Sequence, residues 1–209
     1  MKFQVFDLGL IKYRPALEFQ KQVFEKVRDG KLAHALILCR HNPVITLGRL
    51  AKRTNILASA EDLKQKGIEL IETERGGDVT YHGPGQLTAY PVFNLNKLKK
   101  DIHFFLRNLE GRISSTLNVL GIPAISRKGF TGVWVGESKI ASIGIAVKNW
   151  VTFHGLALNV KAGDLTNFSL IRACGMDIMM TSVESELKKT VRMERVKEIL
   201  IKEMRKWPK

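Results

Sequence analysis

The sequence has few cysteines and no long apolar run. Its 209 residues include two cysteines, Cys39 and Cys174. This number excludes a fold held together by a disulfide framework and fits free thiols in a reducing compartment. No apolar run reaches the roughly 18 residues that a membrane span needs. Residues 1–7 carry an early acid and lack the apolar centre of a signal peptide. We therefore expect a cytoplasmic protein without a membrane partner.

Acidic and aromatic residues are also scarce. The chain has 34 Lys and Arg against 20 Asp and Glu, a formal net charge of +14, which predicts attraction to an acidic partner. The basic residues are scattered, without a block of five or six like charges, and aromatic residues make up only 8%. A basic module that binds nucleic acid would combine clustered cations with stacking aromatics. We therefore expect no nucleic-acid partner.

Several motifs of nucleotide, metal and hydrolase chemistry are missing as well. No spacing of histidines and cysteines matches a zinc site, and there is no Walker motif. The order G-x-G-x-x-G and the Gly-x-Ser-x-Gly elbow are also absent. We expect neither a metal site nor a bound cofactor.

The hydrophobic content and the length of the sequence predict a packed globular domain. Hydrophobic residues make up 44%, and the length suits one domain over residues 1–209. Hydrophobic patterns predict helices near residues 15–29, 61–66, 101–120 and 181–207, and strands near residues 1–10, 34–39, 44–48, 68–73, 87–93, 131–135, 139–147 and 151–160. Hairpins and helices are interleaved, which predicts an α+β fold with a mixed β-sheet packed against helices. Thr181 and Glu184 have the spacing of a capping box.

Residues 75–86 form an unusually glycine-rich stretch. It holds four glycines, a proline, a histidine and an arginine within twelve residues. Glycine lets another group approach the backbone closely, so a ligand could lie against bare main chain here. We expect a turn between two strands. It is either a ligand site or a long glycine hairpin that binds nothing.

Two residues elsewhere could carry covalent chemistry. Cys174 has a small residue on each side and lies outside any clear strand or helix, so it is either an accessible nucleophile or an unreactive loop thiol. Lys139 begins a strand, and simple alternation places it on one face with Ala141, Ile143, Ile145 and Val147. A lysine on an apolar face either snorkels from the strand end or is desolvated for a purpose. If Lys139 reaches Cys174, its charge favours the thiolate and it can carry a proton.

Five segments, taken in order, resemble the lipoyl(octanoyl) transferases. They are HNPVITLGR at 41–49, RGGDVTYHGPGQL at 75–87, GVWVGESKIASIG at 132–144, HGLALNV at 154–160, and ACG at 173–175 followed by TS at 181–182. One such motif would be weak evidence, but five in order, spread from residue 41 to residue 182, are strong evidence. Ala173 stands where the family often has proline, and Ser142 where alanine is common. Neither departure touches the proposed chemistry.

The resemblance implies a fold shared with biotin and lipoate protein ligases. It implies that Cys174 takes an octanoyl group from octanoyl-acyl carrier protein as a thioester, while Lys139 lowers the pKa of the thiol and moves protons. The acceptors would be lysines on the lipoyl domains of 2-oxoacid dehydrogenases and on the glycine cleavage H protein. By the same resemblance, the substrate pocket would be lined by Arg75, Gly76, Gly77, Asp78, Val79, Thr80, Tyr81, His82, Ser142, Ile143, Gly144, Gly155, Leu156 and Ala157.

An ATP-dependent lipoate-protein ligase on the same fold is the alternative. Such an enzyme forms an acyl-adenylate and needs no cysteine. The unbroken HGPGQ at 82–86 and the placement of Cys174 favour the transferase. Transfer from a thioester without ATP or magnesium would distinguish the two.

Overall fold

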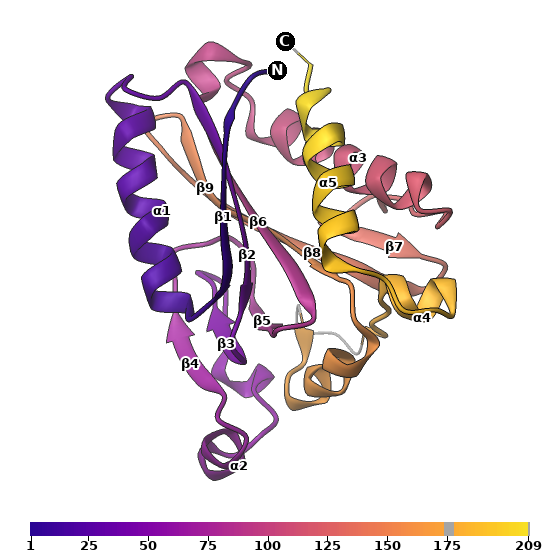
Figure 1. The fold of residues 1–209 in the computed structure, drawn as a ribbon. Helices are drawn as coiled ribbons and strands as arrows, with labels where there is room; N and C mark the ends of the chain where they lie inside the picture. The colour runs from indigo at the N-terminus through magenta and orange to yellow at the C-terminus, as the bar shows by residue number, and fades with distance from the viewer. Residues whose placement is uncertain (174–177, 209) are drawn as a thin grey trace.

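The computed structural model describes residues 1–173 and 178–208 (Figure 1). Within these residues the strands form a six-stranded sheet, in the order β1-β2-β6-β9-β8-β7, and a three-stranded sheet, in the order β4-β3-β5. The large sheet consists of β1 (Gln4–Ile11), β2 (His34–His41), β6 (Gln86–Phe93), β7 (Val133–Val135), β8 (Ser138–Lys148) and β9 (Val151–Asn159). The small sheet consists of β3 (Val44–Leu47), β4 (Glu69–Glu72) and β5 (Val79–His82).

Helices connect these strands. They are α1 (Tyr13–Arg28), α2 (Ala60–Gln65), α3 (Ile102–Val119), α4 (Val183–Leu187) and α5 (Met193–Arg205), with 3₁₀ turns at Arg53–Asn55, Leu95–Lys97 and Ala162–Leu170. Three of the helices, α1, α3 and α5, pack against the large sheet. None of the helices in the described part of the chain is both long and apolar enough to cross a bilayer.

Both sheets mix parallel and antiparallel neighbours. β1 pairs with β2 in parallel, and the other neighbours in the large sheet are antiparallel. In the small sheet, β3 pairs with β4 in parallel and with β5 in antiparallel orientation. The predicted α+β fold with a mixed sheet is therefore confirmed.

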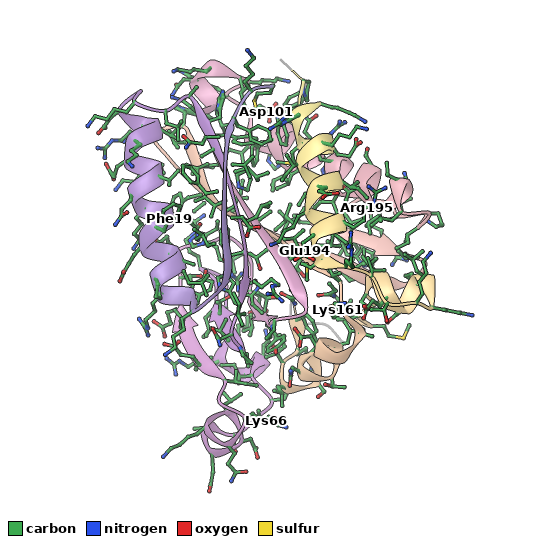
Figure 2. All side chains as sticks on the ribbon, in the orientation of Figure 1. Phe19, Lys66, Asp101, Lys161, Glu194 and Arg195 are labelled. Atoms are coloured by element: carbon green, nitrogen blue, oxygen red, sulfur yellow. The ribbon has the colours of Figure 1, made fainter. Side chains whose placement is uncertain are left out.

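The large sheet is buried on both faces: nearly every residue of its central strands β2 and β6 is buried. On β2, Leu36 and Leu38 face a core shared with α3 and α5, whereas Ile37 and Cys39 face a second core shared with α1. Alternation along the strand explains this division. Side chains fill the space between the sheet and these helices (Figure 2). The site therefore lies on a scaffold that is packed from two sides.

Side-chain caps begin three of the described α-helices, with Ser59 at α2, Asp101 at α3 and Ser182 at α4. The Asp101 side chain accepts a hydrogen bond from the Phe104 amide at 2.9 Å and starts α3. At α4 the expected capping box of Thr181 and Glu184 is wrong: Ser182 is the N-cap and accepts from the Ser185 amide at 3.1 Å. Serine and threonine are both favoured N-caps and stand here at neighbouring positions, so the sequence alone did not decide between them.

The glycine-rich stretch is divided rather than a single turn. A loop at residues 73–78 leads into β5, and a short turn follows at residues 83–85. The prediction of one turn between two strands is wrong because residues 79–82 form a ladder with β3. In the turn, the Gly85 amide donates to Asp164 Oδ2 at 2.5 Å. The 3₁₀ turn at Ala162–Leu170 therefore holds the end of the stretch in place.

Candidate active site

An irregular register between β7 and β8 determines where Lys139 lies. Trp134 pairs with Lys139, but the adjacent Val133 pairs with Ala141, so Ile140 is the extra residue of a β-bulge. Neighbouring residues on β7 face opposite sides of the sheet, and so do their partners on β8. The prediction that Lys139 shares a face with Ala141 is therefore wrong. Ala141 packs in the core beneath α3, and Lys139 lies on the other face.

On that face is a narrow cavity, which we call the inner cavity. It brings together twelve of the fourteen predicted substrate-binding residues and Lys139. Its lining consists of Tyr13, Arg75, Gly77, Asp78, Val79, Thr80, His82, Thr88, Tyr90, Lys139, Ser142, Ile143, Gly144, His154, Gly155, Leu156, Ala157 and Ala173. Residues that are up to 160 positions apart in sequence thus surround one space, as the motif order led us to expect.

Gly76 and Tyr81 lie elsewhere. Gly76 lines a wider depression of about 710 Å³, which we call the outer cleft and which also borders Lys139. Tyr81 packs in the core of the small sheet, where its hydroxyl accepts a hydrogen bond from Asn167 at 2.8 Å. Alternation along β5 accounts for this, since Thr80 and His82 point to the inner cavity and Tyr81 points away.

Cys174 lies outside the described residues, but both flanks of its segment are described. Ala173 lines the inner cavity together with Lys139. On the other side, the Lys139 amide donates to the Met179 carbonyl at 2.8 Å, and the Thr181 amide donates to the Lys139 carbonyl at 3.0 Å. Described residues on both sides of this segment therefore lie next to Lys139: Ala173 lines the same cavity, and Met179 and Thr181 form hydrogen bonds with the Lys139 backbone.

Lys139 is held in a desolvated setting. It is 3% exposed. Its Nζ lies 5.0 Å from the centroid of the Trp134 ring, within the range of a cation–π contact. A Cβ built on Gly132 would come within 2.6 Å of Lys139 Cε. The lysine chain therefore packs directly against the backbone at residue 132, where a side chain would not fit.

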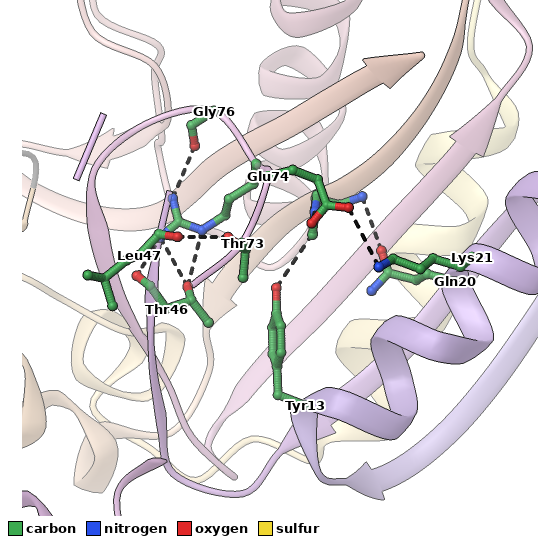
Figure 3. Close-up of polar contacts among 10 residues, drawn as sticks. Tyr13, Gln20, Lys21, Thr46, Leu47, Thr73, Glu74 and Gly76 are labelled. Carbon is green, nitrogen blue, oxygen red and sulfur yellow. Dashed lines mark hydrogen bonds and ion pairs between the residues drawn. The ribbon is translucent and has the colours of Figure 1, made fainter. Parts of the chain in front are cut away.

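The loop at residues 73–78 is braced by a buried arginine (Figure 3). Arg75 Nη2 donates to the Thr46 carbonyl at 2.7 Å and to Thr46 Oγ1 at 3.0 Å, while Nη1 donates to the Gly76 carbonyl at 3.0 Å. The Gly76 amide in turn donates to the Ile145 carbonyl on β8 at 2.8 Å. Arg75 thus ties the small sheet to the loop, and the loop to the strand that carries Lys139.

His82 is a neutral base at the wall of the inner cavity. Gln86 Nε2 donates to the Tyr81 carbonyl and to Asn159 Oδ1, so Gln86 Oε1 accepts from His82 Nδ1 at 3.1 Å. The proton therefore stays on Nδ1 and Nε2 keeps its lone pair. Burial, followed by the charges of neighbouring groups, holds the pKa of His82 well below its usual value.

A second buried histidine belongs to a hydrogen-bonded chain behind the cavity. His41 Nδ1 donates to the Ile11 carbonyl at 3.0 Å, so Nε2 accepts from the Tyr90 hydroxyl at 2.6 Å. Burial lowers the pKa of His41 to about 4 and raises the pKa of Tyr90. Cys39 Sγ lies 3.4 Å from His41 Nε2, and burial raises the pKa of its thiol. Cys39 is thus a poor nucleophile.

Helix α1 contributes to the cavity from the other side (Figure 3). The Tyr13 hydroxyl lies 3.5 Å from His154 Nδ1, and Gln20 Oε1 accepts from the His154 amide at 3.1 Å. His154 has a positive φ of 55°, and burial lowers its pKa to about 4. Its Nε2 has no hydrogen-bond partner among the described residues. The cavity wall therefore presents a neutral imidazole with an unfilled hydrogen-bonding position.

Five lining residues were not among the predicted site residues: His154 and Ala173 belong to the quoted motifs, whereas Tyr13, Thr88 and Tyr90 lie outside them. No local pattern marks Tyr13 or Thr88. Tyr90 carried a signal, because a tyrosine within an apolar strand needs a polar partner when it is buried. Within residues 1–173 and 178–208, no three His, Cys, Asp or Glu side chains gather in a way that could hold a metal ion.

The chain belongs to the lipoyl protein ligase A/B catalytic domain family, which it matches over residues 12–205. A more specific relationship appears among full-length relatives. The octanoyltransferase of Thermoanaerobacter sp. strain X514 is 44% identical over 201 residues, which cover 96% of this chain and 87% of that protein.

Solved structures show the same fold at lower identity. The crystal structure of lipoate-protein ligase A bound with ATP matches with a TM-score of 0.82 and 20% identity, covering 98% of this chain and 84% of that one. The biotin protein ligase of Aquifex aeolicus in complex with biotin and ATP matches with a TM-score of 0.57 and 12% identity, covering 97% and 68%. These matches confirm the expected fold shared with lipoate and biotin ligases, and they concern the fold alone.

Proposed function

We propose that this chain is an octanoyltransferase, an acyltransferase that supplies octanoyl groups for protein lipoylation. The 44% identity to a protein named octanoyltransferase, over nearly the whole chain, supports this activity. The donor in the proposal is octanoyl-acyl carrier protein. The acceptors are lysines on the lipoyl domains of 2-oxoacid dehydrogenases and on the glycine cleavage H protein. Residues 1–209 act as one catalytic domain.

The observation that carries the mechanism is the surroundings of Lys139. A buried lysine shares a cavity with Ala173, which is bonded directly to Cys174, and pairs through its backbone with the segment that follows. Consecutive Cα atoms are about 3.8 Å apart, so the thiol is tethered within a few ångströms of the cavity wall. This supports a Cys174–Lys139 pair as the reacting centre.

In the first step the Cys174 thiolate attacks the carbonyl carbon of the donor thioester. A carbon–sulfur bond to Cys174 forms, the bond to the carrier thiol breaks, and the leaving thiolate takes a proton from Lys139. In the second step the acceptor amine attacks the acyl-enzyme, an amide bond forms, and Cys174 leaves as the thiolate. The proton lost by the amine returns to Lys139, so the enzyme ends as it began.

The electrostatic magnitudes are sufficient. Unit charges about 4 Å apart attract by roughly 4 kcal/mol at an effective dielectric near 20, before desolvation costs. About 1.36 kcal/mol corresponds to one pKa unit, so half of this attraction lowers a thiol pKa of about 8.5 to about 7, where about half of the thiol is ionised at neutral pH. Gly77, Gly144 and Gly155 line the inner cavity without side chains, so main-chain groups can face the developing oxyanion there.

The two cavities suit the two parts of an acylated carrier. In the proposal the acyl chain lies in the inner cavity, between β8, β9 and the loop at residues 73–78. The outer cleft borders the same lysine and has apolar walls that include Leu50, Leu106 and Phe130. The net charge of +14 favours encounter with acidic partner proteins.

Intact-mass spectrometry tests the proposal. The chain is mixed with octanoyl-carrier protein without ATP or magnesium, and the adduct is mapped by proteolysis. We expect one octanoyl adduct at Cys174, its loss in Cys174→Ala, and its retention in Cys39→Ala, since Cys39 is fully buried. Normal turnover by folded Cys174→Ala would refute the covalent route.

The ATP-dependent ligase remains the competing activity. It predicts that octanoate or lipoate is transferred only with ATP and magnesium, and that Cys174→Ala stays active. Strict dependence on ATP in the same assay would reject the transferase.

A further inference from the structure

We propose that Trp134 and Glu110 are positioning residues that hold the ammonium group of Lys139 in the geometry needed to meet the thiolate. The inference rests on the proposed function of Lys139. It adds two residues behind Lys139, one on β7 and one on α3, that do not line the inner cavity.

Trp134 supplies the face against which the ammonium rests. It is 3% exposed, and its ring centroid is 5.0 Å from Lys139 Nζ. The backbone that carries the ring is held in place, since Trp134 exchanges two backbone hydrogen bonds with Ile125, at 2.8 and 2.9 Å. Arg127 Cζ lies 5.9 Å from the same ring. Because the site excludes water, attraction between the ring face and a cation is stronger there than at an exposed surface.

Gly132 covers the stem of the same lysine. Its φ of +134° favours glycine, and a Cβ there would come within 3.2 Å of Lys139 Nζ and 2.6 Å of Cε. The backbone at residue 132 therefore lies close to the lysine chain and limits its rotamers.

Glu110 holds that backbone in place. Its Oε1 accepts from the Gly132 amide at 3.1 Å, and its Oε2 lies 2.6 Å from Arg107 Nη1. The Glu110 side chain is 1% exposed, which is costly for a carboxylate unless its contacts are needed. These contacts connect helix α3, through Gly132, to Lys139.

A lysine side chain has four rotatable bonds, and fixing it costs conformational entropy. The contacts of Trp134 and Gly132 restrict this freedom before substrate arrives. If either contact is lost, the ammonium spends less time near the thiolate, and the thiolate becomes less favoured. Loss of a contact should therefore raise the apparent pKa of Cys174. A variant that only lowers the stability of the fold would leave this pKa unchanged in the folded protein.

The test is the pH profile of Cys174 alkylation by iodoacetamide, mapped by mass spectrometry in the full chain. Trp134→Leu and Glu110→Ala are expected to raise the apparent pKa of Cys174 by about 0.5–1 unit, a threefold to tenfold slower alkylation below that pKa. Trp134→Phe keeps a ring face and Glu110→Gln keeps a neutral acceptor, so both should recover most of the shift. Trp150→Phe, at the exposed β8–β9 turn, and Glu18→Gln, exposed on α1, are the matched controls.

Lys139→Ala is measured in parallel to separate this inference from the proposed function. If Lys139→Ala leaves the profile unchanged, the Cys–Lys pair itself is wrong. If Lys139→Ala shifts the profile but Trp134→Leu and Glu110→Ala do not, the pair stands and the positioning role is overturned. The positioning role is also overturned if these two variants lower only the folded fraction, seen by urea unfolding, with the alkylation midpoint of the folded protein unchanged.

Discussion

Replacing Gly144 with alanine should move the loop that forms one wall of the inner cavity. Gly144 lies on β8 beneath this loop, and a Cβ there would be 2.7 Å from the Gly76 carbonyl oxygen. The contacted atom belongs to the backbone, so no side chain can rotate away. To reach an ordinary separation of about 3.4 Å the carbonyl must retreat by about 0.7 Å, and overpacking of this kind costs about 1–3 kcal/mol.

The same displacement strains the link between the loop and β8. The Gly76 amide donates to the Ile145 carbonyl at 2.8 Å, next to the substituted position. Lengthening this bond accounts for about 1 kcal/mol of the cost. For a domain of this size, each kcal/mol lowers Tm by about 2–4 °C. Because Gly77 and Asp78 of the loop also line the inner cavity, we expect KM for the octanoyl donor to rise more than kcat falls.

Thermal unfolding and steady-state transfer kinetics check this expectation. Gly111→Ala is the control: it lies within α3, nothing would contact its Cβ within 4 Å, and alanine is favoured in a helix by up to about 1 kcal/mol. The control should be as stable as the unmodified chain or more so. If Gly144→Ala shows unchanged Tm and unchanged KM, the close approach of the loop to β8 does not shape the site.

Three further outcomes are expected. His41 and His154 have pKa values lowered to about 4 by burial, against about 6.5 when unfolded, so the unfolded chain binds their protons first. The free energy of unfolding should therefore fall as pH drops from about 6.5 to 4, by up to about 1.4 kcal/mol per pH unit for each; a flat series of urea midpoints would contradict this. Thr88→Val should leave stability unchanged or raise it, as measured by urea unfolding, because Thr88 Oγ1 is buried without a hydrogen-bond partner among the described residues; a loss above 1 kcal/mol would indicate a missed partner. Asp101→Ala removes the cap of α3 and should cost about 1 kcal/mol, whereas Asp101→Asn, which still accepts a hydrogen bond, should cost little.

Local patterns in the sequence were enough to predict most elements. The apolar repeat at residues 101–120 became α3, and its N-cap, Asp101, is the first residue of the predicted helix. Apolar runs became the strands β2, β8 and β9. Twelve of the fourteen motif residues that were expected to share a pocket line the inner cavity.

The tertiary structure decided the details that depend on partners distant in sequence. Alternation within β8 assigned Lys139 to the wrong face, because a β-bulge is a property of two paired strands and is not visible in either one alone. The ladder with β3 likewise turned residues 79–82 into β5 and pointed Tyr81 away from the cavity. Tyr13, Glu110 and Trp134 approach the site from three separate elements. The sequence by itself determined which groups this protein has for its chemistry, since residue type and local spacing are covalent facts; register and packing, which arise only when distant segments meet, determined which of those groups face one another.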